Sequence, residues 1–251
     1  MAGSSPVMIR RWLAPVASLL RPRPLSASPT PPGPLPMTRS GILTRYRHLR
    51  QISRELHESV LNIIAPDVLL NWARRLDLTE GKAVVPETED ELTLPEDLAI
   101  YLPRLGHPHP LDRYAKVARF GPGSDEAIVF AAMRRARFSL WRIERRHHIT
   151  GLILRDLLRD EEIWLVDETM ERSAPLGLEM AARLLQPDSF AMTARIIVPL
   201  LPHLMEEAFA RAPALRHIQG HVLADDPRFT IAVYRAAVTL GAIHSVRFNQ
   251  K

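Results

Sequence analysis

The repeat of apolar residues changes from helical spacing to strand spacing at about residue 137 and returns to helical spacing after residue 200. Between these points apolar and polar positions alternate, which is the two-residue period of a half-buried strand. The clearest run places apolar residues at every second position, namely Phe190, Met192, Ala194, Ile196 and Val198. A block of strands inside an otherwise helical chain restricts the fold to the α+β class.

Five strands are predicted in this block, and short polar turns separate them. Residues 158–161 and 186–189 are the clearest hairpin loops, because they contain the Asp, Pro and Ser residues that tight turns favour. Strands of this length with short connections are typical of a small antiparallel barrel of the SH3-like or OB-like kind. The predicted strands cover residues 137–146, 150–157, 162–168, 177–185 and 190–198.

Helical patterns flank the β block on both sides. From Ile42 to Ile63 apolar residues recur every three or four positions, which predicts an amphipathic helix that ends before Pro66. We expect the apolar face of this helix to pack on a core or in a helical hairpin rather than to form a coiled coil. Further helices are predicted at residues 67–76, 95–102, 111–119, 124–135, 203–211 and 226–240. We therefore expect a helical region at 37–136, a five-stranded barrel-like unit at 137–200 and a helical appendage at 201–251.

The first 36 residues differ from the rest, because they are rich in proline, serine and arginine and contain no acidic residue. Such a segment buries too little apolar surface to offset the entropy of ordering, so we expect it to be disordered. The favoured interpretation is that translation starts at Met37, which places the protein in the cytoplasm. The alternatives are that the segment targets the protein to an organelle or directs its export.

The composition excludes several classes of protein. The chain contains no cysteine, which excludes disulfides, thiolate catalysis, iron–sulfur clusters and cysteine-type zinc sites. Four arginines in the first 36 residues account for most of the net charge of +5, so any attraction for phosphate requires a local patch. The sequence has no apolar run long enough to span a membrane, no phosphate-binding loop and no nucleophile elbow.

Two segments carry a resemblance to other proteins: FSLWRIERRHHITGLILRDLLRDEEIWLVDE, and LEMAARLL followed by FAMTARIIVPL. They resemble certain uncharacterised bacterial proteins, in which a helical N-terminal region precedes a small β-barrel. Some of those proteins end in a cysteine-rich SEC-C metal-binding tail. The resemblance covers residues 45–200 and implies the same fold without an established activity. Because this chain has no cysteine, a metal site of that kind does not carry over.

Two pairs of histidines have the side chains of a metal site. His107 and His109 lie in a loop rich in proline and glycine, without an acidic residue close by in sequence. His147 and His148 are adjacent, and neighbouring residues of a strand point to opposite faces, so they are not expected to share a metal. We therefore expect neither pair to bind a metal.

His203 and Glu206 are three residues apart on a predicted helix and so lie on one face. A catalytic zinc needs three protein ligands and an open position, so we interpret this pair as a solvated surface and expect no cofactor. Paired carboxylates near the hairpin ends could act as acid and base or bind a divalent cation, but solubility and edge protection also favour charges there. These carboxylates are Asp156, Asp160, Glu161, Glu162, Asp167 and Glu168.

A group of arginines and aromatic residues is the best candidate for a functional surface. Arginines beside aromatic rings are typical of proteins that bind single-stranded nucleic acid, because the charges contact the backbone and the rings stack on bases. The favoured alternative is that these arginines form ion pairs with the acidic block at 87–97 or with the hairpin carboxylates. The candidate residues are Arg134, Arg135, Arg137, Trp141, Arg142, Arg145 and Arg146, with Phe138 among them.

These patterns together predict a non-enzymatic binding or adaptor protein whose partner is another protein. The first alternative is a nucleic-acid-associated factor that uses the arginine and aromatic group. The second is a metal-dependent hydrolase at His203 and Glu206, which lacks a third ligand in the sequence pattern.

Overall fold

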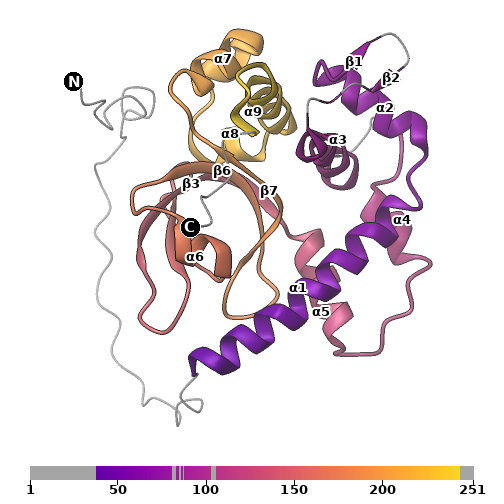
Figure 1. Cartoon of the computed structure of the whole chain (residues 1–251). Helices are drawn as coiled ribbons and strands as arrows, with labels where there is room; N and C mark the ends of the chain where they lie inside the picture. Colours follow the sequence, from indigo (N-terminus) through magenta and orange to yellow (C-terminus); the bar gives the residue numbers. More distant parts are fainter. Residues whose placement is uncertain (1–37, 81–82, 85, 87, 103–105, 244–251) are drawn as a thin grey trace, which may run out of the picture. The chain divides into compact units, whose positions relative to one another are not determined.

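The computed structural model describes residues 38–80, 83–84, 86, 88–102 and 106–243 (Figure 1). From Thr38 onwards the chain forms one compact unit, in which helices precede and follow a five-stranded sheet, and this confirms the α+β fold. The segment predicted to be disordered, residues 1–36, lies outside the described residues. No helix in the described part combines the length and the apolar character that crossing a bilayer requires.

The helices before the sheet agree with the predicted stripes in most places. The side chain of Thr38 accepts a hydrogen bond from the amide of Gly41 and starts the first helix, and Ser124 caps the fifth in the same way. Pro66 occupies the first turn of the second helix, where its missing N–H has no cost. The helices are α1 (Arg39–Leu61), α2 (Pro66–Arg75), α3 (Glu89–Tyr101), α4 (Pro110–Ala115) and α5 (Asp125–Arg134). A two-stranded ribbon, β1 (Thr79–Glu80) and β2 (Ala83–Val84), was not predicted.

The third helix is longer than predicted. The sequence favours a short helix from residue 95, but α3 begins at Glu89 and Pro95 lies inside it. Acidic residues of the block at 87–97 therefore lie in the first turns of this helix, where negative charge complements the helix dipole. The predicted start of this helix at residue 95 was therefore wrong.

The five predicted strands are all present and all antiparallel. They are β3 (Arg137–Arg146), β4 (Leu152–Asp156), β5 (Glu162–Leu165), β6 (Glu179–Leu185) and β7 (Met192–Pro199), and their order in the sheet is β5-β4-β3-β6-β7. The loop after β4 turns at Asp160, which has a left-handed φ of 60°. The loop before β7 contains Pro187, as the turn pattern predicted.

The sheet is curled but does not close into a barrel, so the SH3-like or OB-like closure was a wrong prediction. The outer strands β5 and β7 meet only at one bridge, between Leu165 and Ala191. Two backbone bonds make this bridge: the amide of Val166 donates to Ala191 (2.9 Å), and the amide of Ala191 donates to Trp164 (2.7 Å). Alternating sequence patterns specify which face of a strand is buried, but they do not specify whether the outer strands pair.

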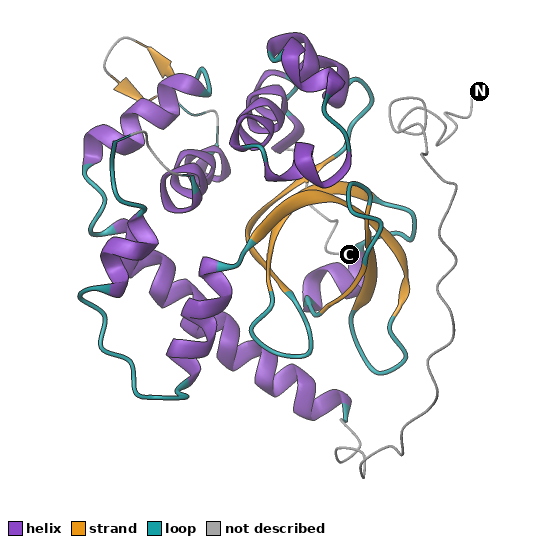
Figure 2. Ribbon diagram, turned by 180° about the vertical axis from the view of Figure 1, so that it is seen from behind, coloured by secondary structure: helices purple, strands orange, loops and turns teal. Residues whose placement is uncertain are grey.

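Both faces of the sheet are covered. The inner face of the curl holds a cluster that includes Trp141, Ile143, Leu154 and Met180, and α6 (Glu168–Ser173) packs there through Met170 (Figures 1 and 2). The helices after the sheet are α7 (Leu204–Arg211), a 3-10 turn (Pro213–His217), α8 (Gly220–Asp225) and α9 (Pro227–Thr239). The outer face contacts α8 and α9, and the ring of Phe138 lies 6.0 Å from Phe229 and 5.4 Å from Tyr234. The C-terminal helices therefore lie on the sheet.

A buried ion pair joins the helices to the outer face of the sheet. Arg183 of β6 donates to both carboxylate oxygens of Asp97 in α3 at 3.0–3.2 Å, and the hydroxyl of Tyr234 in α9 donates to the same carboxylate at 2.9 Å. The two charged side chains are only 6% and 1% exposed. The guanidinium also lies 4.4 Å from the ring centre of Tyr101, whose hydroxyl is 2.8 Å from Nε2 of His57 in α1. Four elements are thus linked by one network of satisfied polar groups.

Candidate functional site

A cavity opens at the end of the curled sheet, beside the seam where β5 and β7 fail to pair. Its volume is about 640 Å³, which lies within the range of roughly 300–1,000 Å³ that is usual for ligand pockets. Residues of β3, β5, β6 and the loop before β7 line it. They include Arg135, Arg137, Trp141, Glu162, Ile163, Trp164, Leu184, Gln186 and Ser189.

The apolar part of the cavity belongs to the core of the sheet. Trp141 is 4% exposed, and its Nε1–H donates to the carbonyl oxygen of Ala182 at 2.9 Å, which holds the ring in one orientation. Leu184 belongs to the same buried cluster, and Ile163 packs against it. An incoming apolar side chain would therefore meet a surface that is already ordered.

The wall of the cavity includes Trp164, which is held from two sides. Its ring stacks on His147 at 4.0 Å between centres, and its Nε1–H donates to the carbonyl oxygen of Thr150 at 2.8 Å. The ring of Phe190 meets it edge-on at 5.8 Å. Burial and the neighbouring His148 lower the pKa of His147, so this imidazole is neutral at pH 7.

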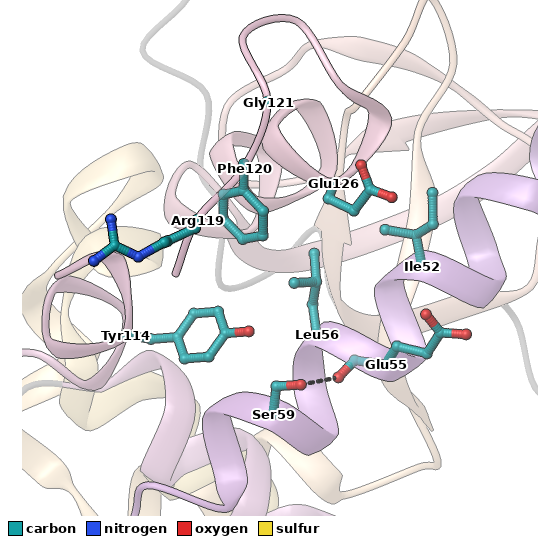
Figure 3. A pocket seen from close by; sticks show the side chains of 9 residues that line it. All are labelled: Ile52, Glu55, Leu56, Ser59, Tyr114, Arg119, Phe120, Gly121 and Glu126. Atoms are coloured by element: carbon teal, nitrogen blue, oxygen red, sulfur yellow. Dashed lines mark hydrogen bonds between the residues drawn. The ribbon is translucent and has the colours of Figure 1, made fainter. Parts of the chain in front are cut away.

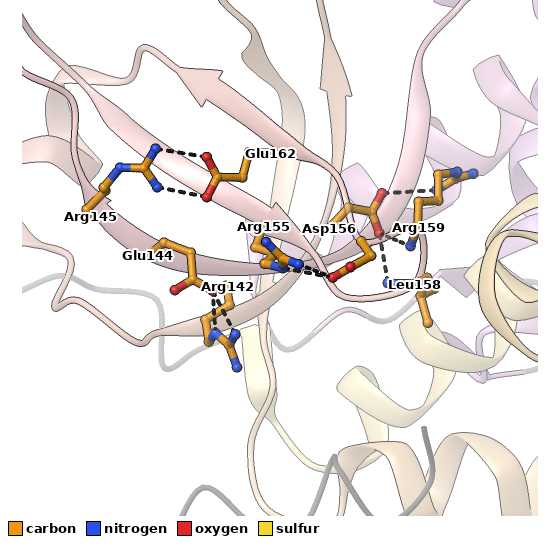
Figure 4. A network of polar contacts seen from close by, with 9 residues as sticks. Arg142, Glu144, Arg145, Arg155, Asp156, Leu158, Arg159 and Glu162 are labelled. Carbon is orange, nitrogen blue, oxygen red and sulfur yellow. Dashed lines mark hydrogen bonds and ion pairs between the residues drawn. The ribbon is translucent and has the colours of Figure 1, made fainter. Parts of the chain in front are cut away.

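The rim of the cavity carries charges of both signs. Arg137 pairs with Glu161 at 3.2 Å, and Arg145 binds both oxygens of Glu162 at 2.8 Å (Figure 4). This hydrogen-bonded pair with Arg145 lowers the pKa of Glu162. The guanidinium of Arg135 has no hydrogen-bond or ion-pair partner among the described residues. The rim therefore offers one unpaired positive group beside paired carboxylates.

The backbone of β5 leaves groups unpaired at the seam. Glu161 accepts a bond from the amide of Asp156 in the β4 hairpin, whereas Trp164 accepts one from Ala191 on the opposite side. Successive residues of a strand direct their N–H and C=O groups to alternate sides. Glu162 therefore directs both groups away from β4, toward the open side, where the described sheet has no further strand. This short edge borders the cavity.

The other outer strand, β7, is covered at its edge. Arg50 of α1 donates through Nη1 to the carbonyl oxygens of Thr193 and Ala194, the latter at 3.1 Å. Because these carbonyls already have a partner, this edge offers less to an incoming strand. The edge of β5 thus has backbone groups without a strand partner, whereas carbonyl groups of β7 are already hydrogen-bonded to Arg50.

The structure places the seven predicted arginine and tryptophan positions in different surroundings. Arg135, Arg137 and Trp141 line the cavity. Both aromatic residues of the group are core residues, since Phe138 is 3% exposed and Trp141 is 4% exposed. The remaining arginines do not line the cavity, although Arg145 reaches its rim through Glu162: Arg134 pairs with Asp112, Arg142 with Glu144, Arg145 with Glu162, and Arg146 donates to the carbonyl oxygen of Glu171.

The expected pairing with the hairpin carboxylates is confirmed for Arg137 with Glu161 and for Arg145 with Glu162, whereas two carboxylates of the acidic block at 87–97 pair with other arginines. Asp97 pairs with Arg183, and Glu96 pairs with Arg195 at 2.5 Å. Both arginines belong to strands that face the helices, whereas the predicted group pairs mainly with carboxylates close to it in the sheet. Whether any of these residues binds a partner remains a prediction.

The histidines are not gathered around a metal site. His109 accepts a bond at Nδ1 from the amide of Leu111 and caps α4, and its Nε2 lies 3.1 Å from the carbonyl oxygen of Tyr101. His147 and His148 lie side by side with ring centres 4.2 Å apart, because β3 ends at Arg146 and the alternation of faces ends with it. The prediction that they point to opposite faces was therefore wrong.

His203 and Glu206 form an exposed contact of 2.9 Å between Nδ1 and a carboxylate oxygen. The described residues contain no group of three or more His, Asp or Glu side chains placed to hold a metal ion. The pair is a local contact at the start of α7.

The six hairpin carboxylates do not form one cluster, because each has a structural partner. Asp156 is 1% exposed and accepts bonds from the hydroxyl of Ser139 and the amide of Leu158, so it holds the β4–β5 turn (Figure 4). Asp167 accepts from the amides of Thr169 and Met170 and caps α6. The other four pair with arginines: Asp160 with Arg155, Glu161 with Arg137, Glu162 with Arg145 and Glu168 with Arg47.

Sequence reasoning missed the part of the cavity contributed by β5 and β6. Ile163, Trp164 and Leu184 read as ordinary core positions of alternating strands, and Gln186 as a turn residue. Only the curl of the sheet brings them together around an opening. The one available signal was Trp164, a large aromatic residue in a short predicted strand.

Comparison with known proteins identifies a family. No curated protein and no solved structure matches the chain. A family model matches residues 42–200, which include most of α1, the whole five-stranded sheet, the cavity and the seam. Its description is a family of unknown function, DUF7986, and the match covers more than half of the 251 residues. The chain therefore belongs to the DUF7986 family of unknown function.

Proposed function

We propose that this chain is a non-enzymatic binding protein that takes an extended segment of a partner protein along the edge of β5. The observation that carries the proposal is the cavity of about 640 Å³ beside an edge whose backbone groups at Glu162 have no strand partner in the described sheet. Addition of a strand to an open edge is a common form of peptide recognition.

Backbone and side-chain contacts would have separate roles in this binding. The N–H and C=O of Glu162 would bond to the peptide backbone, which supplies affinity without selecting a sequence. One apolar side chain of the peptide would enter the cavity and contact Trp141, Ile163 and Leu184, which selects the residue at that position. The charged rim, with Arg135 unpaired among the described residues, favours a peptide with an acidic residue near that side chain.

A nucleic-acid partner is the second candidate, and Arg135 beside Arg137 favours it. Both guanidinium groups lie at the cavity, and a phosphate could bind between them. Against it, Phe138 and Trp141 are buried, so these rings offer no free face for a base to stack on. Binding of oligothymidylate at 50 mM salt, with a logarithmic salt slope that flattens by roughly 0.7 for each arginine replaced, would support this candidate.

The test of the peptide proposal uses the full chain and a phage-displayed library of random peptides. Glu162→Pro removes the outward N–H at the first residue of an edge strand, where proline is tolerated. Glu162→Gln is the matched control, because it loses the same charge and keeps the N–H. Gln186→Trp fills the mouth of the cavity from an exposed position, and Gln186→Ala is its control.

We expect selected peptides to share an apolar residue with polar residues on alternate positions. Their affinity should fall about tenfold or more in Glu162→Pro and Gln186→Trp, and stay within about twofold in the two controls. Thermal unfolding of every variant checks that the fold is intact. Peptides that bind all four variants equally, or no enrichment at all, would reject the β5 edge as the site.

We also propose that the chain is related to the bacterial proteins of which some carry SEC-C tails, and that it is located in the cytoplasm. Support for the first is the resemblance of the β segments to those proteins. Fractionation of cells that express the full chain tests the location, since import through residues 1–36 would place it in an organelle instead.

A further inference from the structure

A second cavity lies between α1 and the segment that joins α4 to α5, away from the sheet (Figure 3). Its volume is about 460 Å³. On one side it is lined by α1 through Glu55, Leu56 and Ser59, and on the other by Tyr114 and Phe120. The proposed peptide site uses none of these residues.

Three aromatic rings gather on one side of this cavity. The ring of Phe130 lies 5.5 Å from that of Tyr114 and 5.4 Å from that of Phe120, and the latter two are 6.4 Å apart. All three pairs are tilted rather than stacked. Phe130 is 6% exposed, whereas Tyr114 and Phe120 keep part of their surface accessible. The two accessible rings rest on a buried third ring and are therefore held in place.

The charges around these rings are mainly negative. Glu55 of α1 and Glu126 of α5 both line the cavity. Hydrogen bonds from its own backbone amide and from Ser124 lower the pKa of Glu126, so it is ionised at pH 7. Arg119 also belongs to the lining, but Figure 3 shows its guanidinium pointing away from both carboxylates. The hydroxyl of Tyr114 has no hydrogen-bond partner among the described residues.

We propose that this cavity binds a small organic cation through its alkylammonium group. The faces of aromatic rings attract cations, and quaternary ammonium groups are held by aromatic cages. The carboxylates of Glu55 and Glu126 add charge complementarity and disfavour an anion. The free hydroxyl of Tyr114 can accept or donate a hydrogen bond to a polar group elsewhere on the ligand.

Titration calorimetry of the full chain with choline tests this proposal, and 3,3-dimethyl-1-butanol serves as the control probe. The alcohol has nearly the same shape as choline with a carbon in place of the charged nitrogen. We expect choline to bind with a millimolar or lower Kd, and the alcohol to bind about fivefold or more weakly. Equal binding of the two probes, or no heat from choline at 20 mM, would overturn the proposal.

Substitutions at Tyr114 and Glu55 separate the contributions of the ring and the charge. Tyr114→Phe keeps the ring and should keep the preference for choline over the alcohol, whereas Tyr114→Leu should remove most of it. Glu55→Gln, at an exposed position of α1, should weaken choline binding and leave binding of the alcohol unchanged. An unchanged preference in Tyr114→Leu, with the melting temperature retained, would also contradict the assignment.

Discussion

The two halves of the sheet handle their charges and edges in opposite ways. In the β6–β7 half, Arg183 and Asp97 are buried beneath helices, and Arg50 covers the edge of β7. In the β4–β5 half, the turn holds the buried pair of Asp156 and Arg159, but at the outer edge Arg145 and Glu162 are 56% and 41% exposed, and the edge of β5 is open next to a cavity. We therefore expect the first half to contribute mainly to stability, and the proposed partner site lies at the edge of the second.

The difference follows from what surrounds each strand. Breaking a buried ion pair leaves an uncompensated charge out of water, so such a pair strongly opposes local opening. Exposed pairs lose little when they break, because water and salt screen the separated charges. A strand that binds a partner must first lose its contacts with water and with neighbouring side chains. Such a strand is better placed where the loss of these contacts costs little free energy.

The largest expected effect comes from Asp97→Asn. The substitution keeps the shape of the side chain but leaves the guanidinium of Arg183 buried without a counter-charge. We expect the free energy of unfolding to fall by about 3–5 kcal/mol in urea denaturation. Asp160→Asn is the matched control, since Asp160 pairs with Arg155 but is 82% exposed, and it should change stability little. Equal losses in the two variants would remove the distinction between the halves.

A pH effect of intermediate size is expected from His57. Burial lowers its pKa from 6.5 to about 4, although its bond to the carbonyl oxygen of Ser53 acts in the opposite direction. The folded state therefore keeps His57 neutral, while the unfolded chain takes up a proton below pH 6.5. Stability contributed by neutral His57 is complete above pH 6.5 and is lost as the pH falls toward 4, by about 3 kcal/mol in total.

The measurement for His57 is the difference in unfolding free energy between the wild type and His57→Gln at several pH values. Taking the difference cancels the carboxylates that titrate in both proteins. It should shrink as the pH falls from 6.5 to 4 and be constant above 7. A difference that does not depend on pH would show that His57 is not the titrating group.

The smallest effect is expected from the exposed pair at the rim. Arg145→Ala should lower the melting temperature by less than about 2 °C in low salt, because surface ion pairs contribute little. In 1 M sodium chloride the difference should disappear. A larger loss that persists in high salt would mean that this rim supports the fold in the same way as the buried pair.

Much of the fold could be predicted from the sequence, because strand and helix periods are local. The five strands were found within a few residues, and Ser124, which caps α5, begins the helix predicted at residues 124–135. The six-residue helix α6 was missed, because about one and a half turns are too short to show a repeat of apolar residues. The only local signal was Asp167, a residue type that often caps helices.

The candidate site depended on contacts that no local pattern contains. Asp97 and Arg183 are 86 residues apart in the sequence, and many other acidic and basic residues could have formed that pair. Whether β5 and β7 would join depended on the curl of the sheet and on the short bridge at Ala191. Phe138 and Trp141, the aromatic residues predicted to stack on bases, are core residues. They lie on opposite faces of β3, and both are buried because both faces of the sheet are covered.

Residue-resolved amide hydrogen exchange along β5 tests the central claim most directly. The amides of Ile163 and Leu165 face β4 and should exchange slowly, whereas those of Glu162 and Trp164 face the seam and should exchange fast. Addition of a peptide selected by phage display should slow the exchange at Glu162 and Trp164 and leave the other two unchanged. If all four amides are equally protected in the free protein, or if a bound peptide leaves the fast pair unprotected, the edge of β5 is not where a partner strand adds.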